Sequence, residues 1–280
     1  MAKKKPKISK DIREAAKGLT EVMRDSLAVL SQDLIKQIMS NYKRLIPSQK
    51  VNAIKGIKPK GVNDYKAAVL NAFAVMAMDA MEKARKEVPA KKNIRLFEQM
   101  DSIKLAEFDR LPPDLQKKIK SRMDLLVGKQ VGDLQKVIEF AYSTAEEETD
   151  SAEQIQSDLN DSAVGWLDST AMEAGAELNA ASVINSARQA FFFDDQVLEE
   201  VEAFEFVNGD PVTEICQDLA GTIFAKDDPQ ADRFFPPLHW NCKSYIVPIL
   251  TGNLKGRDIE KLKPSTKALE SQVQFHEHSH

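Results

Sequence analysis

The feature that most constrains the fold is a helical periodicity near the start of the chain. From Asp11 to Leu45 the apolar residues recur at steps of three and four, the spacing that gathers side chains on one face of an α-helix. This face consists of Ile12, Ala15, Leu19, Val22 or Met23, Leu27, Leu30, Leu34, Ile38 and Leu45. The stretch corresponds to roughly nine turns at about 3.6 residues per turn and ends near Pro47. Such a length favours a helical bundle or an extended docking helix.

Helical character continues beyond this first helix. A loop containing glycine and proline is predicted over 55–63, after which Asn63 or Asp64 can cap a second helix that ends near Val88. Its alanine and methionine content permits close packing against other helices. A short third helix is predicted over 93–110, before a pair of prolines.

A fourth helix begins at Pro113, since proline favours the first helical position. Its apolar face consists of Leu115, Ile119, Met123, Leu126, Leu134, Ile138 and Tyr142. Gly128 and Gly132 are expected to weaken or kink its middle. Its first turns also carry four basic residues, which we interpret as a solvated helix face: Lys117, Lys118, Lys120 and Arg122.

An acidic stretch over 146–161 separates this region from the rest of the chain. It holds seven acidic residues and no basic one. It lacks the alternating oxygen ligands and the central glycine of a dedicated calcium loop, so we interpret it as a linker with one short helix capped by Ser151. Helical character resumes over 162–193 and ends in three phenylalanines, Phe191 to Phe193, an apolar end that the following unit is expected to cover.

The last part of the chain changes from helical to short alternating and turn-rich segments. Strands are predicted over 202–208, 222–224 and 244–250, the last with Tyr245, Val247 and Ile249 on one face. A short helix over 214–219 stopped by Gly221 and a rigid connector over 236–240 lie between them.

The predicted fold class is therefore mainly α with a small α+β C-terminal unit: a long-helix bundle or extended helices, followed by a compact module with short strands. The expected organisation is a basic flexible tail (1–10), a helical domain (11–145), an acidic linker (146–161), a C-terminal domain (162–255) and a polar tail (256–280).

Composition places limits on partners and compartment. A hydrophobic content of 42%, a charged content of 29% and a net charge of -4 indicate a packed core with a well-solvated surface, and they do not demand a nucleic-acid partner. No apolar run approaches the roughly 20 residues that span a bilayer, so no membrane partner is expected. Two cysteines are too few for a disulfide framework, which fits a reducing cytoplasm.

A lysine cluster opens the chain. It consists of Lys3, Lys4, Lys5, Lys7 and Lys10. Such a tail can bind DNA phosphates by displacing counterions, and it can equally be a solvated, flexible terminus. The second interpretation is the plainer one, and DNA contact through these lysines stays open.

The strongest candidates for a metal site are Cys216, His239 and Cys242, because thiolate and imidazole are the ligands that zinc prefers. A closed zinc site needs four ligands, and Thr213 and Ser244 occupy the positions where further cysteines would complete it. A cysteine nucleophile with His239 as base is a second possibility, without a recognisable nucleophile elbow. Packing of buried cysteines is the interpretation we favour, so no metal, cofactor or catalytic residue is predicted.

The same segment carries a longer pattern of turn and packing residues. In order, these are Asp210, Cys216, Leu219, Gly221, Ile223, Phe224, Pro236, Pro237, His239, Asn241, Cys242 and Pro248. The pattern resembles the C-terminal signature of the phage head morphogenesis family, the minor head proteins similar to the F protein of phage Mu. Upstream, Asn185 and Arg188 are similar to the Asn-x-x-Arg end of a helix in that family. The first and last cysteines of the family signature correspond to Thr213 and Ser244, so a site that needs all four is not expected.

The resemblance covers roughly residues 150 to 250 and implies a non-enzymatic role. A family member would be a minor structural protein of a tailed-phage head, present in the head interior or at the portal vertex, and in the host cytoplasm during assembly. Its partners would be the portal protein, the scaffold or the major capsid protein, in assembly, DNA packaging or ejection. The alternatives are a cysteine/histidine-dependent hydrolase or nuclease acting on DNA or cell wall at entry, and a DNA-binding module.

Overall fold

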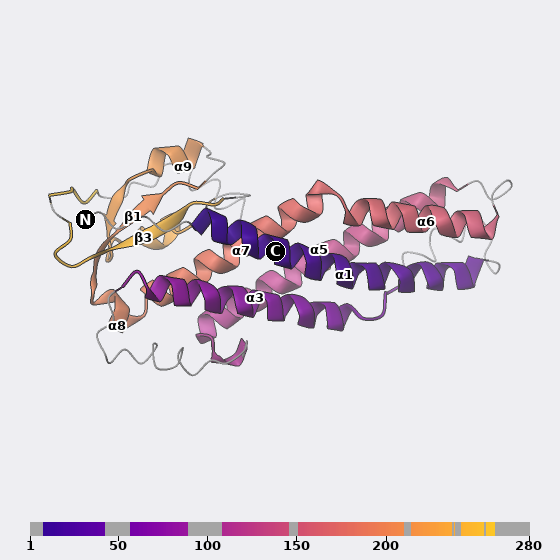
Figure 1. Ribbon diagram of the computed structural model, residues 1–280, viewed down its shortest axis with the longest axis horizontal. Helices are drawn as coiled ribbons and strands as arrows, with labels where there is room; N and C mark the ends of the chain where they lie inside the picture. Colours follow the sequence, from indigo (N-terminus) through magenta and orange to yellow (C-terminus); the bar gives the residue numbers. More distant parts are fainter. Residues whose placement is uncertain are drawn as a thin grey trace. The chain divides into compact units, whose positions relative to one another are not determined.

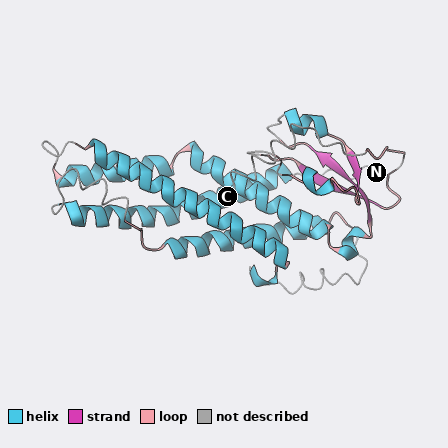
Figure 2. Cartoon of the chain, turned by 180° about the vertical axis from the view of Figure 1, so that it is seen from behind, coloured by secondary structure: helices cyan, strands magenta, loops and turns pink. Residues whose placement is uncertain are grey.

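The structure is a computed structural model that describes residues 8–42, 57–88, 108–145, 151–209, 214–236, 238, 242–254 and 256–260. The described chain is mainly helical, with one small antiparallel sheet near its C-terminal end (Figures 1 and 2), so the predicted fold class is confirmed. The helices are α1 (Ile8–Tyr42), α3 (Val62–Arg85), η1 (Phe108–Arg110), α5 (Pro113–Thr144), α6 (Ala152–Leu167), α7 (Thr170–Phe192), α8 (Asp195–Leu198), α9 (Glu214–Leu219) and η2 (Ala231–Phe234). The strands are β1 (Val201–Val207), β2 (Ile223–Ala225) and β3 (Tyr245–Leu250).

The long first helix is present as α1 and starts three residues before Asp11. Seven positions of the predicted stripe are buried: Ile12, Leu19, Met23, Leu27, Leu30, Leu34 and Ile38. Met23 rather than Val22 lies on the inner face, and Ala16 is buried where Ala15 was expected, since Ala15 is only half-buried. Leu45 lies outside the described residues. The end expected near Pro47 lies outside the described residues. The periodicity predicts this element, because a helix places apolar residues at steps of three and four on one face, where they can be buried together.

The second and fourth helices are α3 and α5. Gly61 precedes α3 with a φ of 88°, a left-handed conformation that glycine adopts without strain. The helix α5 runs as one element through Gly128 and Gly132, where an added Cβ would meet nothing within 4 Å. The third predicted helix, over 93–110, lies largely outside the described residues, and only its last three residues are seen, as η1.

The helix predicted after Ser151 is confirmed. The Ser151 side chain accepts a hydrogen bond from the Gln154 backbone N–H at 3.2 Å and so caps α6. The continuous helical character predicted over 162–193 needs one correction, because α6 ends at Leu167 and α7 begins at Thr170. Asp168 is the C-cap of α6, and its N–H donates to the Val164 carbonyl. This polar residue interrupts the helical periodicity between α6 and α7. Residues 146–150 lie outside the described part, so the boundary expected there stays a prediction.

The chain divides into two compact units. The sheet unit comprises Met1–Lys17, Phe73–Ser121 and Glu177–His280, and the helical unit comprises Gly18–Ala72 and Arg122–Ala176. Each of α1, α3, α5 and α7 contributes residues to both units, so each unit is assembled from segments that are distant in the sequence.

The helical unit has a polar cluster inside its apolar core. Gln130 of α5 accepts a hydrogen bond from the Tyr65 hydroxyl of α3 at its Oε1 atom. Its Nε2 atom lies 3.2 Å from the sulfur of Met172 on α7 and 3.8 Å from that of Met23 on α1. Burial raises the pKa of Tyr65, so its hydroxyl stays protonated as the donor. Four helices thus meet around one buried amide, which fixes their relative register in a way that apolar contacts alone do not.

The sheet has the strand order β2-β1-β3, with both pairs antiparallel. Phe206 of β1 directs its backbone groups toward the β2 side, since its N–H donates to Thr222 and its C=O accepts from Gly221, each at 2.9 Å. Its partner on β3, Ile246, therefore belongs to a non-hydrogen-bonded pair and turns its own backbone groups to the outer side of the sheet. Pro248 lies two residues further along and has the same orientation, so its missing N–H costs the ladder no bond.

Candidate functional site

The motif residues that the structure describes lie in the sheet unit. Cys216 on α9 and Cys242 before β3 are buried, as is Pro236, while Leu219 at the end of α9 is half-buried. Gly221 has a φ of 79° and ends α9, as the sequence predicts. The other predicted motif positions lie outside the described residues: Asp210, Pro237, His239 and Asn241.

The apolar end of α7 is covered by the sheet, as expected. The Phe193 ring stacks on Phe204 of β1 with centroids 5.4 Å apart and meets Phe235 edge-on at 4.8 Å. Phe204, Phe224 and Phe235 also contact one another, at centroid distances between 5.5 and 6.2 Å. Such offset and edge-to-face pairs add to the free energy gained from burying the rings. The cluster fixes α7 against one face of the sheet.

Asn185 and Arg188 of α7 bind the outer edge of β3. The Asn185 side chain donates to the carbonyl oxygen of Ser244 at 3.2 Å, and Arg188 Nη2 donates to the carbonyl oxygen of Ile246 at 3.0 Å. The two carbonyls belong to alternate residues that point the same way, and the two side chains lie one helical turn apart. The Asn-x-x-Arg pair is therefore a clamp between α7 and β3, and we name it the α7–β3 clamp.

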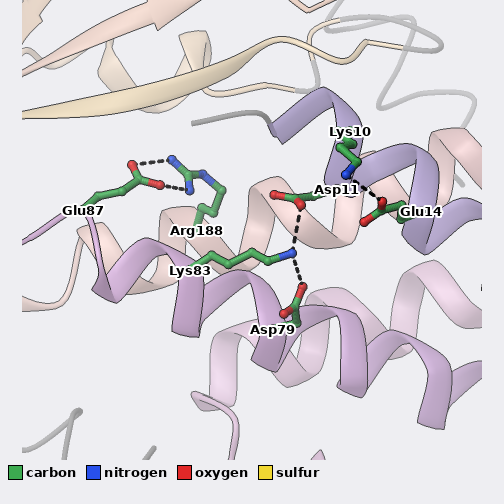
Figure 3. A network of polar contacts seen from close by, with 7 residues as sticks. All are labelled: Lys10, Asp11, Glu14, Asp79, Lys83, Glu87 and Arg188. Atoms are coloured by element: carbon green, nitrogen blue, oxygen red, sulfur yellow. Dashed lines mark hydrogen bonds and ion pairs between the residues drawn. The ribbon is translucent and has the colours of Figure 1, made fainter. Parts of the chain in front are cut away.

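Arg188 is held from a second side by Glu87, just past the end of α3. Its two terminal nitrogens donate to the two carboxylate oxygens of Glu87, at 2.6 and 3.0 Å (Figure 3). The Arg188 side chain is 2% exposed and its guanidinium lies 5.0 Å from the centre of the Phe192 ring. A buried guanidinium needs such partners, because an unpaired charge there is strongly unfavourable.

A second ion pair lies at the start of the clamped segment. Lys243 Nζ contacts Glu177 Oε1 of α7 at 2.7 Å, and the Lys243 side chain is buried. Gly209 packs directly against this segment: an added Cβ would lie 2.1 Å from the Lys243 carbonyl oxygen. Its N–H lies 3.3 Å from the Ser244 hydroxyl oxygen. Sequence reasoning missed Glu87, Glu177 and Lys243, because nothing local distinguishes them from the many exposed charges.

The two cysteines lie side by side in the interior. Their sulfur atoms are 3.7 Å apart and no disulfide joins them. The hydrogen bond with Cys216 and burial together raise the pKa of the Cys242 thiol far above its ordinary range. A catalytic cysteine needs the opposite, an accessible thiolate with a lowered pKa. Within the described part of the chain, no group of three or more His, Cys, Asp or Glu side chains is placed to hold a metal ion.

The face of the sheet opposite the phenylalanines is covered by the chain that follows β3. Leu254 packs against Ala203, Ile223 and Ile249. Arg257 pairs with the buried Glu205 carboxylate at 3.1 Å, and the Glu260 N–H donates to the Ile223 carbonyl at 2.7 Å. These contacts come from Leu254, Arg257 and Glu260, so part of the predicted polar tail 256–280 belongs to the module.

Of the lysines proposed for nucleic-acid contact, only Lys10 lies in the described part. It is a residue of α1 that pairs with Glu14 at 3.3 Å, and both side chains are exposed (Figure 3). Nearby, Lys83 of α3 contacts Asp79 at 2.8 Å and Asp11 of α1 at 2.9 Å. Desolvation lowers the pKa of Lys83, but the hydrogen bonds with Asp79 and Asp11 outweigh it and raise the value. Lys3, Lys4, Lys5 and Lys7 lie outside the described residues.

Comparisons of the chain with models of known families, with curated proteins and with solved structures found no match. Among the described helices, none combines the length and the apolar character needed to cross a bilayer.

Proposed function

We propose that the protein is a minor structural head protein of a tailed bacteriophage. It associates with the portal vertex or the capsid interior during head assembly, DNA packaging or ejection. In this role the sheet unit is a docking module and the long helices supply contact surface to the portal, scaffold or major capsid protein.

The α7–β3 clamp is the observation that carries the proposal. The motif resemblance has two halves, a helix that ends in Asn185 and Arg188 and a strand region that holds Cys242 and Pro248. The clamp joins these halves through side chain to backbone bonds at Ser244 and Ile246. Residues of the two halves therefore serve one local architecture, which supports treating them as a single structural module.

The chemistry of the described motif residues favours a structural role over an enzymatic one. The thiols are buried, and the raised pKa of Cys242 keeps it protonated at neutral pH. Asn185 donates to the Ser244 carbonyl, and Arg188 donates to Glu87 and to the Ile246 carbonyl, so both side chains bind groups within the protein. We therefore assign these side chains to stabilising the module and not to binding a substrate.

The proposal is tested in phage particles. Procapsids and mature heads are purified from cells that express the chain with an epitope tag, and the tag is quantified against the portal protein. We expect the tagged chain to sediment with procapsids and to co-purify with portal oligomers in a fixed ratio. Its absence from both kinds of particle, with the portal protein present, would exclude a head role.

The same preparation separates the alternatives. Cys216→Ser, Cys242→Ser and His239→Ala chains should enter particles and support infection if the role is structural. A hydrolase or nuclease that depends on these side chains would lose its activity and, with it, infectivity. For direct DNA binding, duplex binding is measured across a range of salt concentrations, because phosphate-driven affinity falls linearly on a log-log plot and a flat response excludes it.

A further inference from the structure

We propose that Cys216 and Cys242 are a dithiol pair that closes to a disulfide when the protein leaves a reducing compartment. The pair joins α9 to the segment that enters β3, so its oxidation would link the short helix covalently to the sheet. The inference does not depend on the proposed function, since it stands on the position of the two sulfur atoms.

The two thiols are already close to bonding geometry. Their sulfur atoms lie 3.7 Å apart in the interior, and the cysteines are 26 residues apart in the chain. A disulfide needs a sulfur separation of about 2.05 Å, so closure requires the side chains to approach by roughly 1.6 Å. Side-chain rotation and small movements of a short helix are of that size.

The helix α9 depends on this contact. It has six residues, all of them described, and Cys216 is its one buried side chain. A helix of this length is not stable by itself in water, so packing must hold it. Both thiols are buried, and local opening of α9 exposes Cys216 first because Cys242 lies outside that helix, beside β3. The order of opening gives an oxidant access to one thiol before the other.

The reaction is a thiol–disulfide exchange with a small-molecule disulfide such as oxidised glutathione. The Cys216 thiolate attacks one sulfur of the oxidant, which forms a mixed disulfide and releases one glutathione thiolate. Cys242 gives its proton to solvent, and its sulfur then attacks Cys216 Sγ and releases the second glutathione. The two cysteine sulfurs lose one electron pair, which reduces the disulfide bond of the oxidant to two thiols.

The expected effect is a module that opens less often. The bond would close a ring of about 27 residues, which by loop entropy lowers the population of the opened module by roughly 400-fold. In a cytoplasm kept reducing by glutathione the pair stays as two thiols. The module would then be adaptable during synthesis and fixed afterwards.

The test exposes the full-length chain to oxidised glutathione in mild urea, followed by unreduced tryptic digestion and mass spectrometry. The wild-type chain should give one species that joins the peptides 189–226 and 234–243. After oxidation, hydrogen exchange of the α9 amides should slow by up to roughly 400-fold, and reduction should reverse the change.

Two single variants serve as matched controls. The Cys242→Ser chain should carry one glutathione on Cys216, and the Cys216→Ser chain should react much more slowly, because opening of α9 uncovers Cys216 while Cys242 stays beside β3. Wild-type chains that carry adducts without the cross-link, or that keep both thiols unmodified, would overturn the inference. So would one-to-one Zn²⁺ binding that blocks oxidation, since the pair would then be a metal ligand set.

Discussion

Glu87 and Arg188 form a two-point ion pair, 2.6 and 3.0 Å long, between residues that are 101 positions apart in the chain. The same guanidinium also donates to the Ile246 carbonyl of β3. Arg188 therefore connects the end of α3, the helix α7 and the sheet edge within one unit. A planar group with several fixed donors can do this, and a lysine ammonium cannot replace it with the same geometry.

Replacement of Arg188 by methionine should be among the most destabilising single changes in the sheet unit. It leaves the Glu87 carboxylate, 15% exposed, without its partner, and we expect a loss of about 3–5 kcal/mol in the free energy of unfolding. Urea denaturation of the full chain, followed by circular dichroism, measures the change. The matched control is Lys10→Gln, which breaks the exposed pair with Glu14 and should cost less than about 0.5 kcal/mol. Equal effects of the two variants would contradict the role given to Arg188.

Gly209→Ala tests the close approach of two backbone segments. The added methyl group would lie 2.1 Å from the Lys243 carbonyl oxygen, so the segment before β3 must move, at a cost of about 1–3 kcal/mol or more. Gly128→Ala is the control, because its position in α5 is open and alanine favours a helix by about 0.5–1 kcal/mol. We expect thermal denaturation midpoints to move in opposite directions. A stabilised Gly209→Ala chain would show that the contact is not tight.

The buried amide of the helical unit can be examined with a double-mutant cycle. Tyr65→Phe removes the donor to Gln130, and we expect a loss of about 1–3 kcal/mol because a buried acceptor is left unpaired. With Gln130→Leu already present, the same change should cost much less, since no acceptor remains. Urea titration of the four proteins gives the coupling free energy, and additive effects would argue against a direct hydrogen bond.

The buried Cys242 thiol predicts a pH dependence. Its pKa is raised in the folded protein above an ordinary value of 9.0, so from about pH 9 upward the unfolded chain loses a proton that the folded chain keeps. Stability from this group is therefore complete below pH 9 and falls as pH rises, by up to about 1.4 kcal/mol per pH unit. The window from pH 9 to 10 lies below the ordinary pKa of 10.0 of Tyr65. Reduced Cys242→Ala chains should have a shallower slope in urea titrations across this window, and an unchanged slope would contradict the assignment.

Much of the fold could be predicted because its causes are local. The stripe of α1, the cap at Ser151 and the glycine that ends α9 are each determined by residues within a few positions. The cover of Phe193 by the sheet followed from an apolar helix end that needed burial. Local rules also explain the one correction in that region, since Asp168 is a polar helix end inside a regular pattern.

The clamp and its supports could not be predicted in the same way. The chain has 39 basic and 43 acidic residues, and no local feature distinguishes the buried Lys243 or the half-buried Glu87 and Glu177 from the others. Their partners are set by how distant segments pack, which no helical or strand period encodes. The contact of Gly209 with Lys243 depends on the same packing.

The orientation of β3 has a consequence for how the protein behaves at high local concentration. An exposed strand edge is a template on which other chains can add strands and aggregate. At this edge the carbonyls of Ser244, just before β3, and of Ile246 are already bonded to α7, and Pro248 offers no N–H at the next outward position. Many copies could therefore be crowded into a small volume without polymerising through this edge.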